Sequence, residues 1–115
     1  MDNLIFNDDP TEIAVLDSVK RFKELGGGCL VENSTHGLHR KSGYLKRVSQ
    51  ETGVNIVAGT GYYVVASQDP LTISLSTEQL VQHMEKELTE GTLEDPSVKC
   101  GLVGEIGITF PMHGE

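Results

Sequence analysis

The chain of 115 residues carries a formal net charge of −8, and its length allows one domain at most. An acidic chain without a lysine and arginine cluster is a poor match for nucleic acid or an anionic membrane, so we expect neither as a partner. No apolar run approaches the roughly 20 residues that cross a bilayer. The N-terminal sequence lacks the basic and apolar segments of a signal peptide, and we expect a cytoplasmic protein.

The first predicted helix begins at "DPTE", where Asp9 is a candidate N-cap and Pro10 suits the first helical position. Gly26 is a natural stop for this helix. Apolar residues recur at every third position and are expected to face the core, namely Ile13, Leu16, Val19 and Phe22.

Two predicted strands flank a second helix. The short apolar run "CLVEN" at 29–33 is typical of a strand covered on both faces. The basic run "HRKSGYLKR" is interpreted as the solvated start of a helix at about 44–52, and "VNIVAGT" at 54–60 predicts the second strand. Cys29 and Cys100 lie in apolar strand-like runs, so we expect both to be buried, reduced thiols.

A third helix and a third strand complete the alternation. Ser76 and Gln79 form an S-x-x-Q capping box, Gly91 ends the helix, and 98–106 predicts the strand. Alternating helices and apolar strands indicate an α/β fold with a parallel sheet. A doubly wound open sheet and part of a (β/α)8 barrel both fit this pattern. No G-x-G-x-x-G stands between a strand and a helix, so we do not expect nucleotide binding.

Polar residues follow each apolar run at the predicted carboxyl end of the strand, where parallel α/β folds build their sites. We expect them to gather at one edge of the sheet. Glu32 and Asn33 also fit a plain role at the start of a loop, and the tyrosines also fit packing. The set comprises Glu32, Asn33, Thr60, Tyr62, Tyr63 and Glu105.

Glu105 differs from the others because it stands inside the predicted third strand, in "GLVGEIGI", with no cation within three positions. A lone ionised carboxylate in a buried strand costs several kcal/mol unless a positive partner compensates it. Such a residue is a metal ligand, a catalytic acid or half of a buried ion pair. Divalent cations bind carboxylate oxygens readily, and a metal is therefore our first interpretation for Glu105.

The histidines carry no comparable pattern. His36 and His39 form an H-x-x-H in a loop, and we expect them to be exposed or to cap a turn. His83 falls on a mixed helix face and His113 lies near the end of the sequence. No G-x-S-x-G motif and no catalytic cysteine context is present, so covalent nucleophilic catalysis has no support.

Three segments together carry a family resemblance: "GGGCLVENSTHGLHR", "ETGVNIVAGTGYYV" and "KCGLVGEIGITFPM". The chain resembles phosphotriesterase-related proteins, in the phosphotriesterase branch of the amidohydrolase superfamily, from about residue 12 to residue 111. The resemblance implies a (β/α)8 TIM barrel with two divalent metals, usually zinc, at the carboxyl ends of its strands. It also implies hydrolysis of a small-molecule ester or amide by a metal-bound hydroxide.

The resemblance assigns roles to a few residues of this sequence. "GEIG" places Glu105 as the carboxylate that bridges the two metals, where classical phosphotriesterases carry a carbamylated lysine. Tyr62 and Tyr63, in the "TGYY" element with Thr60 and Gly61, resemble positions that border the substrate pocket. The four histidines receive no role from the resemblance.

A complete barrel needs roughly 250 residues, whereas this chain resembles about strands 2–4. Only the fourth-strand ligand of the family's metal site is present, and one carboxylate holds no pair of zinc ions. We therefore interpret residues 1–115 as a fragment of a metal-dependent hydrolase barrel domain, inactive in isolation. The alternatives are a non-catalytic interaction fragment and a small flavodoxin-like binding domain. The sequence sets no oligomeric state.

Overall fold

A computed structural model describes residues 8–111 and contains one three-stranded parallel sheet, with the strands in the order β1-β2-β3. Cys29 pairs with Asn55 between the first two strands, and Gly59 pairs with Leu102 between the second and third. The predicted parallel α/β arrangement is confirmed. The strands are β1 (Cys29–Glu32), β2 (Asn55–Thr60) and β3 (Leu102–Val103).

The third strand is much shorter than the predicted 98–106. The ladder ends at Val103, and the next residue, Gly104, has φ of 144°, a conformation that favours glycine. The chain therefore leaves the sheet before Glu105.

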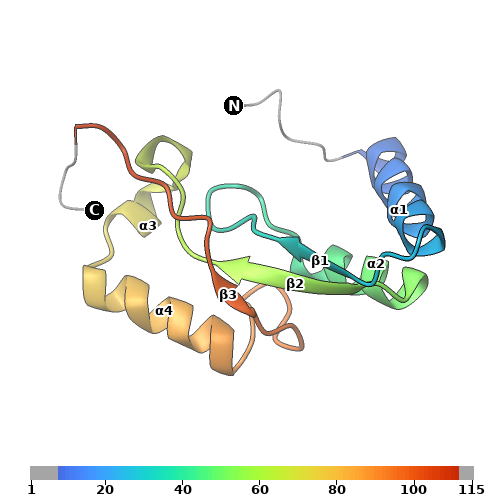
Figure 1. Ribbon diagram of the computed structural model, residues 1–115. Coiled ribbons are helices and arrows are strands. Elements are labelled where there is room, and N and C mark those ends of the chain that lie inside the picture. The colour runs from blue at the N-terminus through green and yellow to red at the C-terminus, as the bar shows by residue number, and fades with distance from the viewer. Residues whose placement is uncertain (1–7, 112–115) are drawn as a thin grey trace.

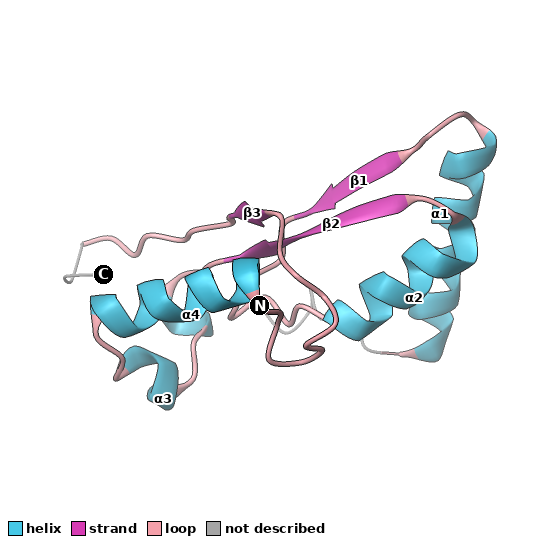
Figure 2. Cartoon of the chain, turned by 90° about the horizontal axis from the view of Figure 1, so that it is seen from below, coloured by secondary structure: helices cyan, strands magenta, loops and turns pink. Residues whose placement is uncertain are grey.

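The helices alternate with the strands along the chain (Figure 1). Figure 2 shows α2 and α4 on the same side of the strands. Within residues 8–111 no helix combines the length and the apolar character that a membrane crossing requires. The helices are α1 (Asp9–Glu24), α2 (Ser42–Thr52), α3 (Pro70–Ile73) and α4 (Thr77–Thr89), with a 3-10 turn η2 (Val65–Ser67) before α3.

Local sequence signals explain where the helices begin. The capping box of α4 is confirmed, since Gln79 N–H donates to Ser76 Oγ and Ser76 N–H donates to Gln79 Oε1. The N-cap of α1 is Asp8, which accepts from Thr11 N–H at 2.9 Å, so the prediction of Asp9 was one residue late.

A small apolar core joins α1, α2 and the start of β2 through Val19, Val48 and Val54, the residue just before β2. Leu16 and Phe22 pack against it, whereas Ile13 is 60% exposed, so its predicted inward position is wrong. Steps of three residues fall about 60° short of a helical turn. A residue two such steps from buried Val19 has therefore turned about 120° away from the core.

The sheet is covered by helices on one face only. Leu30 and Ile56 pack against the core, while Val31 and Val103 are 63% and 54% exposed on the other side. The expectation that β1 is covered on both faces is therefore wrong for the described chain. Cys29 is exposed for the same reason, which corrects its predicted burial, whereas Cys100 is buried; both are free thiols.

We predict that Val48→Ala lowers the free energy of unfolding by roughly 2 kcal/mol, because it leaves a cavity at a side chain that is 1% exposed. Val15→Ala, also in a helix but 41% exposed, is the matched control and should change the value by less than about 0.5 kcal/mol. Urea unfolding of both variants measures the difference. Equal effects would contradict this description of the core.

Candidate functional site

The backbone of Glu105 lies where the three strands end. Its N–H donates to the carbonyl of Asn33 at 2.8 Å, and its carbonyl accepts from Thr35 Oγ1 at 2.8 Å. The preceding N–H, of Gly104, donates to the carbonyl of Thr60 at 2.8 Å. These bonds attach Glu105 to the chain that follows β1 and to the last residue of β2, at the predicted edge of the sheet.

The Glu105 residue itself is exposed, which corrects the expectation of a carboxylate buried inside a strand. The side chain lies beyond the last ladder pair, and none of residues 8–111 forms a hydrogen bond or ion pair with its carboxylate. Because the Glu105 carboxylate is not buried by the described residues, it does not need a cation to offset a desolvation cost. The carboxylate oxygens are instead available to an external ligand.

Residues 8–111 contain no group of three or more histidine, cysteine, aspartate and glutamate side chains that could hold a metal ion. Glu105 fits a divalent cation chemically, as one uncommitted oxygen ligand. Glu32 does not provide a second free carboxylate ligand, because its carboxylate accepts hydrogen bonds from the N–H and the hydroxyl of Ser34 at 3.0 and 2.5 Å. Glu32 thus takes the plainer role of stabilising its own loop.

Tyr62 and Tyr63 lie just beyond β2 and are bound to the loop after β1. His36 and Tyr62 form a parallel bridge, and the Tyr63 N–H donates to the His36 carbonyl at 3.0 Å. The Tyr62 ring stacks on the His36 ring, with centroids 4.9 Å apart. Burial, followed by the negative charge of Glu87, raises the pKa of Tyr62 above its ordinary value.

A buried ion pair that the sequence did not predict lies behind this edge. Arg40 donates to both carboxylate oxygens of Glu87, at 2.6 and 2.9 Å, and the two side chains are 1% and 3% exposed. Arg40 also donates to the Gly59 carbonyl at 2.8 Å and to both oxygens of Glu94 at 2.9 Å. This bidentate geometry fixes the guanidinium between β2, α4 and the loop after α4.

Glu87 has further partners. Thr60 Oγ1 donates to it at 2.5 Å, and His36 Nε2 lies 3.1 Å from its other oxygen. Burial alone would favour the neutral acid, but the hydrogen bonds from His36, Arg40 and Thr60 outweigh it and hold the pKa of Glu87 well below its ordinary value. Thr60 therefore faces the helix side of the sheet and not an open pocket.

Two expectations are corrected by this cluster. Arg40 is buried, although its basic run was interpreted as solvated, and His36 is half-buried and paired, although it was expected to be exposed or capping. His39 is exposed, as expected, and His113 lies outside the described residues. One sequence signal could have revealed the burial of Glu87. It lies seven residues after Leu80 and three after Met84, and therefore on the same face of the helix as these apolar residues.

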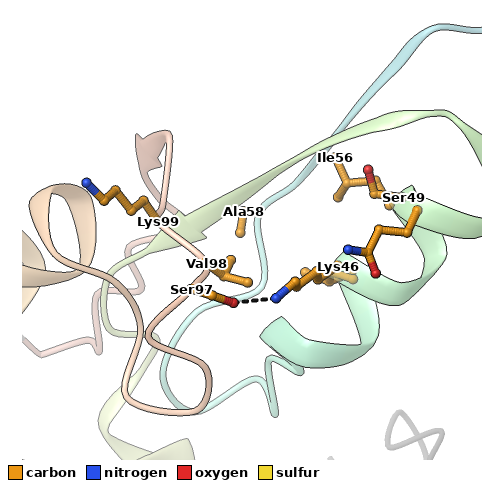
Figure 3. Close-up of a pocket in the computed structure, with 9 residues that line it drawn as sticks. Lys46, Ser49, Ile56, Ala58, Ser97, Val98 and Lys99 are labelled. Atoms are coloured by element: carbon orange, nitrogen blue, oxygen red, sulfur yellow. Dashed lines mark hydrogen bonds between the residues drawn. The ribbon is translucent and has the colours of Figure 1, made fainter.

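A cavity of about 250 Å³ lies elsewhere, between α2, β2 and residues 97–99 (Figure 3). Lys46 and Lys99 contribute to its lining, and the Lys46 ammonium donates to Ser97 Oγ. Ile56 and Ala58 line it from the helix-covered side of β2. The cavity includes neither Glu105 nor the two tyrosines, so it is separate from the strand ends.

Parallel strands with helices between them and polar residues at their carboxyl ends define this chain as part of an α/β barrel of the TIM type. The chain belongs to the phosphotriesterase family, whose model matches residues 4–114. The predicted family and barrel fold are confirmed, and the doubly wound alternative is not supported.

The chain is 42% identical over 111 residues to the N-acetyltaurine hydrolase of Homo sapiens, covering 96% of this chain and 31% of that protein. It is 39% identical over 116 residues to the phosphotriesterase-related protein of Aedes aegypti, covering 96% and 33%. The chain thus spans about a third of the length of these relatives.

Two solved structures support the same fold. A resiniferatoxin-binding protein from Rhodobacter sphaeroides superposes with a TM-score of 0.82 at 32% identity, covering 89% of this chain and 28% of that one. The phosphotriesterase homology protein from Escherichia coli, with phosphate in its active site, superposes with a TM-score of 0.77 at 26% identity. The match covers 85% of this chain and 33% of that one.

We predict that the chain loses stability as the pH falls below about 4.5, the ordinary value for Glu87. The folded-state pKa is lowered, so the ionised carboxylate stabilises the fold above that pH and this contribution disappears on acidification. Glu87→Gln should cost roughly 3 kcal/mol at neutral pH, because it leaves Arg40 buried without its charge partner. The same substitution should also reduce how steeply the free energy of unfolding falls with acidification. Urea unfolding between pH 7 and about pH 3 measures this dependence.

The matched control for this experiment is Glu85→Gln, an exposed glutamate in the same helix. It should keep the steep acid dependence of the unsubstituted chain. If both variants retain that dependence, another carboxylate controls acid unfolding.

Proposed function

We propose that this chain is a segment, residues 1–115, of the barrel domain of a cytoplasmic, zinc-dependent hydrolase that cleaves an ester or amide bond in a small molecule. The observation that carries the proposal is the uncommitted carboxylate of Glu105, whose backbone is attached to the ends of the strands. Membership of the phosphotriesterase family supports the class of reaction. No nucleic acid or membrane partner is included in the proposal.

Each candidate residue has a distinct task in this proposal. Glu105 is a metal ligand, in the position of the bridging carboxylate, and the remaining ligands lie outside the described residues. When bound, two divalent cations supply an activated water and polarise the bond to be cleaved. Tyr62 and Tyr63 form part of the wall of the substrate pocket, and their attachment to the loop after β1 keeps that wall in place.

The names of the relatives favour an amide over a phosphate ester as the first substrate to test. The Homo sapiens and Xenopus tropicalis proteins, at 42% and 40% identity, are named N-acetyltaurine hydrolases. We therefore propose a small N-acyl amide as substrate, with organophosphate esters as the comparison class.

We predict that Glu105→Ala in the full-length protein removes bound zinc and lowers kcat/KM for amide hydrolysis by about 100-fold or more, since even outer-shell changes at metal sites cost 10–100-fold. Inductively coupled plasma mass spectrometry measures the metal, and release of the free amine measures turnover. Glu85→Ala, an exposed glutamate of α4, is the control and should retain both. Full zinc content in the Glu105 variant would refute the assignment of Glu105 as a ligand.

A second candidate function applies to the 115-residue chain by itself: a catalytically inert segment whose remaining role is non-catalytic interaction. The favouring observation is that residues 8–111 offer no group of three metal-binding side chains. We predict that the isolated chain binds zinc no more than weakly and hydrolyses neither esters nor amides, because one carboxylate neither holds nor activates a metal pair. Metal analysis and an assay with added zinc test this, and sustained zinc-dependent turnover would contradict it.

A further inference from the structure

The hydrogen bonds that attach Glu105 to the strand ends are of two kinds. The Glu105 N–H donates to the Asn33 carbonyl at 2.8 Å, which is a bond between backbone groups. The neighbouring N–H, of Gly104, makes a bond of the same kind to the Thr60 carbonyl. The third bond comes from a side chain, because the Thr35 hydroxyl donates to the Glu105 carbonyl at 2.8 Å. This third bond is therefore the one that a side-chain substitution can remove.

Thr35 is built to hold that bond in one geometry. The residue is 0% exposed, and a buried hydroxyl without access to water takes a protein acceptor, here the Glu105 carbonyl. The backbone around Thr35 is also fixed. Its carbonyl accepts from the Leu38 N–H at 3.0 Å, and the N–H of the next residue, His36, donates to the Gly61 carbonyl at 3.0 Å.

Gly61 leaves the space in which Thr35 and Glu105 meet. Its φ of 151° is a conformation that favours glycine. A Cβ at this position would lie 3.3 Å from the Glu105 carbonyl oxygen and 3.6 Å from Cγ2 of Thr35. The chain after β2 therefore packs closely against both partners of the hydrogen bond.

The held backbone matters because the Glu105 side chain is free of such contacts. None of residues 8–111 forms a hydrogen bond or ion pair with its carboxylate, so the described chain positions Glu105 through its backbone. A metal ligand has to be held within roughly 0.5 Å of its binding geometry by the groups that support it. A loosened backbone at Glu105 would spread the positions of the carboxylate.

We propose that Thr35 is a positioning residue for the metal site, whose buried hydroxyl fixes the Glu105 backbone and thereby strengthens the binding of a divalent cation by the carboxylate. The effect on metal binding rests on the proposed role of Glu105 as a ligand, whereas the anchoring of the backbone does not. Thr35 itself binds no metal and touches no substrate in this proposal.

The test measures the zinc dissociation constant of the full-length, metal-free protein by competition with a chromophoric chelator. Thr35→Val replaces the hydroxyl with a methyl group of similar size and should weaken zinc binding by about 10-fold or more, the range of outer-shell changes at metal sites. Thr35→Ser keeps the hydroxyl and should stay within about 3-fold of the unsubstituted protein. Thr35→Ala takes the place of Thr35→Val if the valine variant does not fold, with the same expected weakening.

The matched control is Thr92→Val, at a threonine that is 1% exposed. The Thr92 hydroxyl donates to the Asp95 carbonyl at 3.0 Å, within the loop after α4. This variant should lower the melting temperature to a similar degree as Thr35→Val, but should leave the zinc dissociation constant within about 2-fold, because effects at separate sites are independent.

A second measurement reads the anchoring without metal or turnover. Amide hydrogen exchange of the metal-free protein follows the N–H groups of Gly104 and Glu105, which bond to the strand ends. Loss of the Thr35 hydroxyl should increase local opening and speed this exchange by roughly 3-fold or more, whereas Thr92→Val should leave it unchanged.

The outcomes separate this inference from the proposed function. Full zinc content in Glu105→Ala refutes the ligand role, while faster amide exchange in Thr35→Val still supports the anchoring. Loss of zinc in Glu105→Ala with an unchanged dissociation constant in Thr35→Val overturns the role of Thr35 alone. Equal weakening in Thr35→Val and either Thr35→Ser or Thr92→Val also overturns it, and unchanged exchange in Thr35→Val overturns the anchoring.

Discussion

The buried ion pair between Arg40 and Glu87 is the constraint on which the described fold depends. It joins residues 47 apart in sequence, and removing two charges from water is costly unless each is fully bonded. Here the compensation comes from the whole neighbourhood, through the Gly59 carbonyl, Thr60 and Glu94. The position of α4 against the end of β2 is therefore set by polar geometry, whereas the valine core around Val48 sets the position of α1 and α2.

The need for a directional polar partner explains why a buried glutamate lies so near the carboxyl ends of the strands. An apolar contact between α4 and β2 would hold the helix but would give the loops beyond the strands no directional partner. Glu87 supplies such partners, because it binds Thr60 at the end of β2 and His36 in the loop after β1. Two loops that carry candidate site residues thus share one carboxylate as an anchor. Polar clusters of this kind favour a single arrangement, since any other leaves a buried charge unpaired.

Local and periodic features were predictable from the sequence, and long-range pairings were not. The capping box at Ser76, the parallel strands and the polar strand ends follow from signals within a few residues. Arg40 lies in the loop before α2 and its partner Glu87 lies in α4, so the sequence around Arg40 alone gave no sign that this basic run contains a buried cation. His36 was misjudged for the same reason. Glu105 was placed correctly at the strand ends, but its expected burial assumed a strand that in fact ends at Val103.

The exposure of Glu105 and the bare face of the sheet have one physical origin. In a closed barrel, the inward side chains of each strand are covered by those of other strands. Val31 and Val103 lack such cover among residues 8–111, and the same residues contain no group of three metal-binding side chains around Glu105. The relatives are about three times as long as the stretch that this chain matches. Further strands of a barrel would cover the apolar face and would lie beside Glu105 at the strand ends. The apolar face and the proposed metal ligand at the strand ends would therefore be completed by the same surroundings, while the Arg40–Glu87 pair fixes α4 against the end of β2 within this segment.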